Sequence, residues 1–229
     1  MSERGHEIGP GIFQVAGPDM TDGRDAAAYL VEDSGDLAII DAGAGPSYSR
    51  LKDNLTRRGC NAQNLKLAIA THAHIDHIGG LAALVRDYGP SVVAHEPDAA
   101  AIESADPVFT AANWYGLRPE PVSVTHKLTG KEHAFALGQT QLRCFHTPGH
   151  TPGSMVVYFE RDGRTYLFGQ DIHGPFNSDF QSDIPTWRQS MQRLLDLNAD
   201  VLAEGHFGVY YGRDKVRSFI QSHLDRNPF

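Results

Sequence analysis

Cysteine is scarce in this chain of 229 residues, which has two, Cys60 and Cys144. Two cysteines cannot form the disulfide framework of a small secreted protein or a cysteine-only metal site, so we expect both to be small buried hydrophobic residues. The sequence also lacks a run of about 18 consecutive apolar residues, the length that a membrane-spanning helix needs. Its first residues lack the apolar segment of a signal peptide, and we therefore expect a cytoplasmic protein with no membrane partner.

Basic residues are in the minority, with 20 Lys and Arg against 28 Asp and Glu and a net charge of −8. Without a long basic run, a broad grip on a phosphate backbone is excluded, so no nucleic-acid partner is expected. Hydrophobic residues at 41% and charged residues at 21% are typical of a folded globular protein. The length fits a single domain over residues 1–229.

Short apolar runs alternate with helical stretches, as in proteins whose helices cover sheets. Two hairpins are predicted, one from strands 27–33 and 37–41 and one from strands 155–160 and 165–168. Their similarity indicates two related halves, although any two hairpins with a glycine turn resemble one another. Helical periodicity predicts helices at 47–58, 78–88, 186–197 and 215–225.

Histidine is abundant, with 12 residues, and several lie in the run Thr71-His72-Ala-His74-Ile-Asp76-His77-Ile-Gly79-Gly80. This run follows the apolar strand 65–70 and precedes a helix. His72 and His74 are two residues apart and so point to the same side of an extended strand, while Asp76 and His77 lie further round the turn. Four polar groups crowded together without a partner would be costly to desolvate. The pattern predicts a site for two metal ions.

With three further segments, the sequence resembles the metallo-β-lactamase-fold superfamily, specifically its glyoxalase II-like branch. Those segments are His146-Thr-Pro-Gly-His150, Phe168-Gly-Gln-Asp171 and Ala203-Glu-Gly-His206, in the family's order. The resemblance covers almost the whole chain. It implies an α/β fold, a four-layer αβ/βα sandwich with the metals in a groove at one edge of its two sheets.

The resemblance also implies the residues that hold two metal ions. His72, His74 and His150 would bind the first ion, Asp76, His77 and His206 would bind the second, and Asp171 would bridge them. Asp41, in Ile-Ile-Asp41-Ala-Gly, would support the ligand loop from behind. Five imidazoles and two carboxylates with no thiolate suit two Zn²⁺ ions per chain and also admit Fe or Mn.

Such a site predicts a binuclear zinc-dependent hydrolase that cleaves a small carbonyl substrate, a thioester, lactone or ester, with a hydroxide bridging the metals as nucleophile. Asp76 is the candidate that orients this hydroxide and carries a proton to the leaving group. His173 follows Asp171 by two residues, and we expect it either to contact substrate and donate a proton or to be an ordinary hydrogen-bonded loop histidine.

Several branches of the superfamily are disfavoured by single residues. The β-lactamase branch with a cysteine ligand would need cysteine at Asp171, and the di-iron oxygen reductases would need glutamate at His74. Lactonases often have tyrosine where this chain has Gly174. Glyoxalase II enzymes continue into a helical glutathione-binding domain, whereas 23 residues follow His206 here, so glutathione specificity is not expected.

Two other functions stay open. A mononuclear iron persulfide dioxygenase of the same superfamily is the alternative, because Asp179-Phe180-Gln181 partly matches a segment of those enzymes. A non-catalytic binding protein is disfavoured by the complete ligand set. In the segment 104–125, Trp114 and Tyr115 mark either a substrate lid or a plain surface loop.

Overall fold

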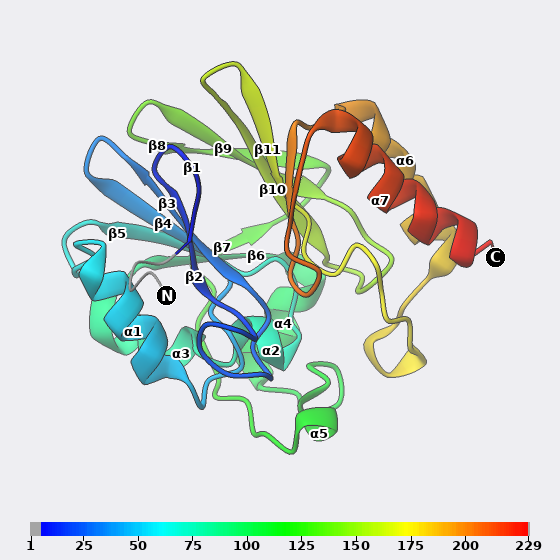
Figure 1. The fold of residues 1–229 in the computed structure, drawn as a ribbon. Coiled ribbons are helices and arrows are strands. Elements are labelled where there is room, and N and C mark those ends of the chain that lie inside the picture. Colours follow the sequence, from blue (N-terminus) through cyan, green and yellow to red (C-terminus); the bar gives the residue numbers. More distant parts are fainter. Residues whose placement is uncertain (1–5, 229) are drawn as a thin grey trace.

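A computed structural model describes residues 6–228. Residues 1–5, which belong to the segment expected not to be a signal peptide, lie outside this range. Two β-sheets face each other (Figure 1). The first sheet has the order β1 (Glu7–Gly9), β2 (Ile12–Ala16), β3 (Ala28–Asp33), β4 (Asp36–Ile40), β5 (Leu65–Ile69), β6 (Ser91–His95), β7 (His126–Leu128). The second has the order β13 (Val209–Tyr211), β12 (Val201–Ala203), β11 (Arg164–Phe168), β10 (Met155–Arg161), β9 (Thr140–His146), β8 (Glu132–Leu137).

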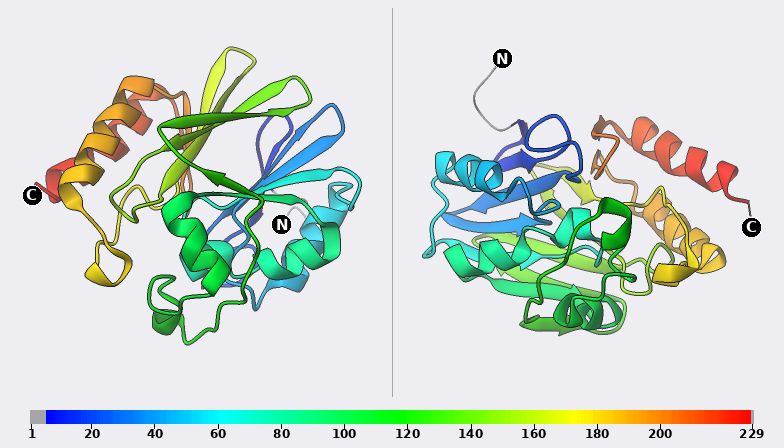
Figure 2. Two further views of the ribbon diagram at one scale, coloured as in Figure 1. Left: turned by 180° about the vertical axis from the view of Figure 1, so that it is seen from behind. Right: turned by 90° about the horizontal axis from the view of Figure 1, so that it is seen from below.

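Helices cover the outer faces of both sheets (Figures 1 and 2). On the side of the first sheet are α1 (Tyr48–Arg57), α2 (Ile75–Ile78), α3 (Leu81–Tyr88), α4 (Glu96–Ser104) and α5 (Ala112–Tyr115). On the side of the second sheet are α6 (Ile184–Leu197) and α7 (Arg213–Arg226). A short 3₁₀ helix, η1 (Ser178–Phe180), precedes α6.

Alternating side chains of the strands divide the core into separate apolar layers. In β4, Ile39 packs toward the helices, whereas Ile40 belongs to the layer between the sheets. In β10, Val156 packs against α6 and α7, whereas Val157 faces the opposite sheet. The predicted four-layer αβ/βα sandwich is therefore confirmed. Cys60 and Cys144 are buried, as expected.

Both predicted hairpins are present, as β3–β4 and β10–β11. In each case the second strand pairs in parallel with the next strand of the chain, β4 with β5 and β11 with β12. This shared order agrees with two related halves, whose relationship stays a prediction. Between residues 6 and 228, no helix has both the length and the apolar character that crossing a membrane requires.

The helix predicted at 78–88 is present as α3 over residues 81–88, but its predicted start is wrong, because Ile78 ends α2 and the chain breaks at Gly79 and Gly80. The loop after β4 passes very close to this break. A Cβ atom would lie 2.1 Å from the carbonyl oxygen of Ala44 at Gly79 and 2.2 Å from that of Ala42 at Gly80. Only glycine lets the two segments approach so closely, and this approach fixes the position of the preceding histidine run.

Candidate metal centre

The first half of the site is built where β4 and β5 end side by side. The chain runs from β5 through His72 and His74 into α2, which carries Asp76 and His77. Asp41 directly follows β4, and its Oδ2 lies 2.7 Å from Nδ1 of His77 while its Oδ1 accepts a hydrogen bond from the backbone N–H of Thr71 at 2.9 Å. Asp41 thus fixes the ring of His77 and the start of the loop. This is the supporting role that the family resemblance implied for Asp41.

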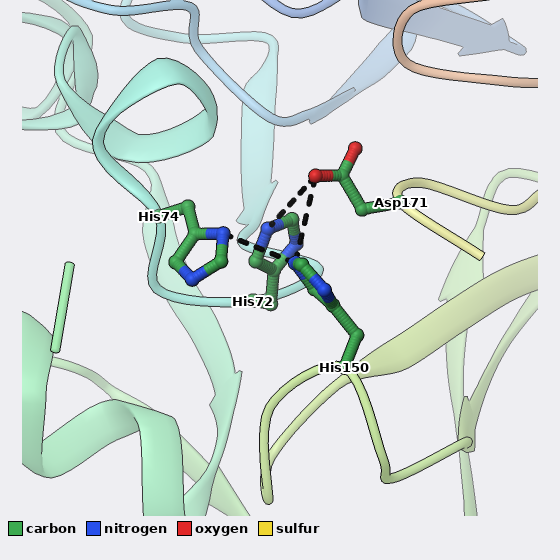
Figure 3. A group of neighbouring side chains, drawn as sticks. All are labelled: His72, His74, His150 and Asp171. Carbon is green, nitrogen blue, oxygen red and sulfur yellow. Dashed lines mark hydrogen bonds and ion pairs between the residues drawn. The ribbon is translucent and has the colours of Figure 1, made fainter. Parts of the chain in front are cut away.

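The second sheet supplies the other half from three strand ends. His150 lies in the loop after β9, Asp171 follows β11 and His206 follows β12. In Figure 3, the side chains of His72, His74, His150 and Asp171 point toward one another from the two sheets. All seven predicted ligand residues therefore meet at one edge of the sandwich.

Four of these residues, His72, His74, His150 and Asp171, form a first cluster whose ligand atoms all lie within 4.8 Å of one another. Nε2 of His150 is 3.0 Å from Nδ1 of His74. Oδ2 of Asp171 is 3.7 Å from Nε2 of His72 and 3.5 Å from Nε2 of His150. All four side chains are buried, so their polar atoms face each other with little solvent between them.

Asp76, His77 and His206 form a second cluster beside the first. Oδ2 of Asp76 lies 3.7 Å from Nε2 of His77 and 3.3 Å from Nε2 of His206. The other oxygen of Asp171, Oδ1, is 3.2 Å from His77 Nε2 and 3.1 Å from His206 Nε2. The carboxylate of Asp171 therefore stands between the clusters, with one oxygen toward each.

Two carboxylates of the site have a left-handed backbone, Asp41 with φ 61° and Asp171 with φ 50°. Aspartate tolerates this region better than most residues, but it still carries a conformational cost. Each residue leaves its strand end at this bend, with the carboxylate among the histidines. Such local strain is typical of functional sites.

Burial lowers the pKa of the three histidines in the first cluster. Their pKa values also fall through mutual repulsion, to about 3 for His74 and about 4 for His150, and well below the usual range for His72. At neutral pH these imidazoles are uncharged and keep a lone pair for a metal ion. Uncharged imidazole is the form in which histidine binds metals.

The second cluster has the opposite preference. Although burial opposes it, the adjacent carboxylates of Asp171 and Asp76 raise the pKa of His206 to about 10. The same carboxylates, with Asp41, raise the pKa of His77 well above its usual value against the effect of burial. This half of the site favours positive charge, which either protons or metal cations can supply.

The buried atoms of the site fit a metal cation. Nε2 of His72 is buried and makes no hydrogen bond to any part of the chain between residues 6 and 228. A buried polar atom without a partner is costly, and native proteins normally provide one. Together with the nitrogen and oxygen donors around it, this atom is suited to a divalent ion such as zinc.

Beside the clusters, His173 pairs with a buried carboxylate. Its Nδ1 lies 2.6 Å from Oε1 of Glu204, and its ring centre is 5.6 Å from that of His206. His173 is therefore a hydrogen-bonded loop histidine, which was one of the two roles expected for it, and its ring also borders the site. Glu204 was not predicted as a site residue. Its position in the motif Ala203-Glu-Gly-His206, two residues before a candidate ligand, is the sequence feature that could have indicated it.

Asp98 is a second residue near the site that was not predicted from the sequence. Its buried carboxylate accepts hydrogen bonds from the backbone N–H groups of Ala73 at 2.8 Å and Gly153 at 2.7 Å, and from the hydroxyl of Thr151 at 2.8 Å. Ala73 lies between two candidate ligands, and Thr151 follows His150. Asp98 therefore ties the two ligand loops together across the sandwich.

The segment that carries Trp114 and Tyr115 lies next to the site, as expected of a lid. Burial of the Tyr115 hydroxyl and the charge of the Asp76 carboxylate raise the pKa of Tyr115. The exposed Trp114 ring is 5.5 Å from the ring of Phe180, which lies 4.3 Å from that of His74. Phe180, part of the dioxygenase-like segment, is fully buried and supports the His74 ring.

Comparison with known proteins agrees with this arrangement. The chain is 27% identical over 244 residues to the acyl-coenzyme A thioesterase MBLAC2 of Gallus gallus, covering 96% of this chain and 85% of the relative. It is 28% identical to the probable metallo-hydrolase YybB of Bacillus subtilis, covering 86% and 88%. A hydroxyacylglutathione hydrolase of Anaeromyxobacter dehalogenans is 32% identical over 138 residues, covering 60% of this chain and 44% of the relative. These relatives confirm the glyoxalase II-like resemblance and the predicted class of metal-dependent hydrolase.

Solved structures share the fold. A metallo-beta-lactamase from Cronobacter sakazakii superposes with a TM-score of 0.82 at 20% identity, over 98% of this chain and 95% of that one. BJP-1, a subclass B3 metallo-beta-lactamase of Bradyrhizobium japonicum, gives a TM-score of 0.79 at 23% identity, over 96% and 90%. The family model of the metallo-beta-lactamase superfamily matches residues 21–206, a span that holds both clusters. By this match and this shared architecture, the chain belongs to the metallo-beta-lactamase superfamily.

Proposed function

We propose that this chain is a binuclear zinc hydrolase that cleaves a small thioester. One ion would be held by His72, His74 and His150, the other by Asp76, His77 and His206, and Asp171 would bridge them. The observation that carries the proposal is the Asp171 carboxylate, whose two oxygens face different clusters. Because each cluster takes ligands from both sheets, we retain the prediction that residues 1–229 form one domain.

When bound at these residues, zinc ions would supply Lewis acidity to the substrate carbonyl and would lower the pKa of a bound water to about 7. The residues of the chain orient the reactants around them. The Asp76 carboxylate, which contacts His206, would accept a proton from the attacking water and pass it to the leaving thiolate. Glu204 occupies Nδ1 of His173, so that Nε2 is the nitrogen available to substrate.

Among the predicted carbonyl substrates, the thioester has the best support. The relatives include an acyl-coenzyme A thioesterase and a hydroxyacylglutathione hydrolase, both named for thioester substrates. Phe180 packs beside His74 and is fully buried, so it supports that imidazole ring rather than contacting the substrate.

Metal analysis combined with a substrate panel tests this function. Protein purified without added metal is expected to hold about two zinc ions per chain and to cleave acyl thioesters faster than lactones or oxygen esters. Asp171→Ala should lose metal and activity and keep its fold by circular dichroism, whereas the same change at the exposed Asp179 should alter neither. One iron per chain with oxygen uptake would instead identify the dioxygenase.

A further inference from the structure

A groove opens on the surface next to the metal centre, between the segment after β12 and helix α7. It has a volume of about 570 Å³ and is lined by four aromatic rings, those of Phe207, Tyr210, Phe219 and His223. The polar side chains of Asp214, Lys215, Ser218, Ser222 and Arg226 complete its lining. Phe207 is 54% exposed, a large fraction for a phenylalanine. An exposed apolar surface of this kind is typical of a binding site.

The groove is continuous with the site through ring contacts. Phe207 directly follows the candidate ligand His206, and its ring centre is 4.8 Å from that of His173, which in turn contacts His206. On the other side, the Phe207 ring lies 6.0 Å from Phe219, which is 4.6 Å from His223. A series of contacting rings therefore joins His206 of the second cluster to the groove on α7.

We infer that this groove binds the acyl chain of the thioester substrate, an inference that rests on the proposed thioesterase function. The acyl chain is bonded directly to the reacting carbonyl carbon, so its first methylenes must lie beside the clusters. Phe207, which lines the groove, directly follows His206 of the second cluster. A polar thiol carrier such as coenzyme A has its charged nucleotide at the far end of a long arm. The aromatic lining favours the aliphatic part of the substrate over the charged nucleotide, because burying apolar surface against the rings stabilises the complex.

Lys215 and Arg226 are compatible with this occupant. Their aliphatic stems can cover the outer part of a bound chain while their charged ends stay in water. Each buried methylene is expected to strengthen binding by about fourfold, as long as the groove has room for it. The structure therefore predicts a preference for long acyl chains over acetyl.

Acyl-coenzyme A substrates of 2, 4, 8 and 12 carbons test this inference on the zinc-loaded full chain. Ser218 is exposed and lines the groove, so Ser218→Trp fills it, and Phe207→Ala removes its exposed ring. Both variants should lower kcat/KM for the 12-carbon substrate at least tenfold, mainly through KM, and should affect the acetyl substrate far less. Arg217→Trp places the same ring on α7 outside the groove and should leave the whole series unchanged.

Binding of dodecanoate, measured by calorimetry, separates this inference from the proposed function. If no thioester is cleaved but dodecanoate binds and Ser218→Trp abolishes the binding, the thioesterase proposal fails and the groove is confirmed as an acyl site. If thioesters are cleaved and neither variant changes the dependence on chain length, the acyl site is overturned. A dimer in solution that Phe207→Ala dissociates would overturn it as well, because the groove would then be an interface.

Discussion

Nδ1 of His173 lies 2.6 Å from Oε1 of Glu204, and the same buried carboxylate accepts hydrogen bonds from the backbone N–H groups of His206 at 2.7 Å and Phe207 at 3.0 Å. One side chain thus orients a histidine at the site and the loop that carries a candidate ligand. Residues that orient ligands in this way typically matter almost as much as the ligands.

Glu204→Gln should therefore lower kcat by about 10- to 100-fold. The amide keeps the shape of the side chain, but it offers one acceptor oxygen where the carboxylate uses two, so either His173 or the His206 loop loses its partner. Steady-state kinetics and zinc content measure the effect. Glu160→Gln, an exposed substitution, serves as the control, and an unchanged kcat in Glu204→Gln would show that this orientation is unimportant.

Asp41→Ala should weaken zinc affinity by about 10- to 100-fold, chiefly at the second cluster. The change removes the acceptor for Nδ1 of His77 and for the Thr71 backbone, so the ligand ring loses its fixed orientation. Competition with a chromophoric chelator measures the affinity. Asp53→Ala, on the exposed side of α1, should bind zinc like the parent chain, and equal affinities in both variants would refute the supporting role.

Tyr115→Phe should lower kcat by about tenfold with a small change in KM, because it removes a hydroxyl that interacts electrostatically with the Asp76 carboxylate. Trp114→Ala should act mainly on KM, since the exposed indole lies against Phe180 at the mouth of the site. Both are measured by steady-state kinetics across the thioester series. If neither parameter moves in either variant, α5 is not a lid.

Stability should fall at acid pH through the stacked rings of His95 and His146, whose centres are 3.6 Å apart. Burial lowers the pKa of both in the folded state, so each stabilises the fold above the unfolded value of about 6.5 and loses that contribution as pH falls below it. In metal-free protein, His146→Gln should therefore flatten the decline of Tm between about pH 6.5 and 5. The exposed His126→Gln should not, and parallel declines in all three proteins would contradict the expectation.

Removing the metal should lower Tm by about 5–10 °C, the shift expected when a ligand at about 100 times its Kd is withdrawn from a chain of this size. Added zinc should restore it. Differential scanning calorimetry with and without a chelator measures the shift, and Asp171→Ala should show none. A chelator-insensitive parent chain would mean that the clusters do not hold a metal.

The hairpins and the histidine run could be predicted from the sequence because their signals are local. Short apolar runs mark β4 and β10, and the histidine run lies within a few residues of a strand end. The four-layer fold and the roles of His150, Asp171 and His206 were predicted through the family resemblance. By contrast, the role of Asp98 depends on partners 25 and 55 residues away, which no local pattern joins. The break between α2 and α3 was missed for the same reason, since it arises from contact with Ala42 and Ala44.

Four of the candidate ligands belong to loops of the first sheet and three to loops of the second, so each half of the chain carries an incomplete set. Docking of the two halves and metal binding are therefore thermodynamically linked, so that each favours the other. A cation that prefers the complete set acts as a crosslink across the seam between the sheets, and anything that loosens the seam must release the cation.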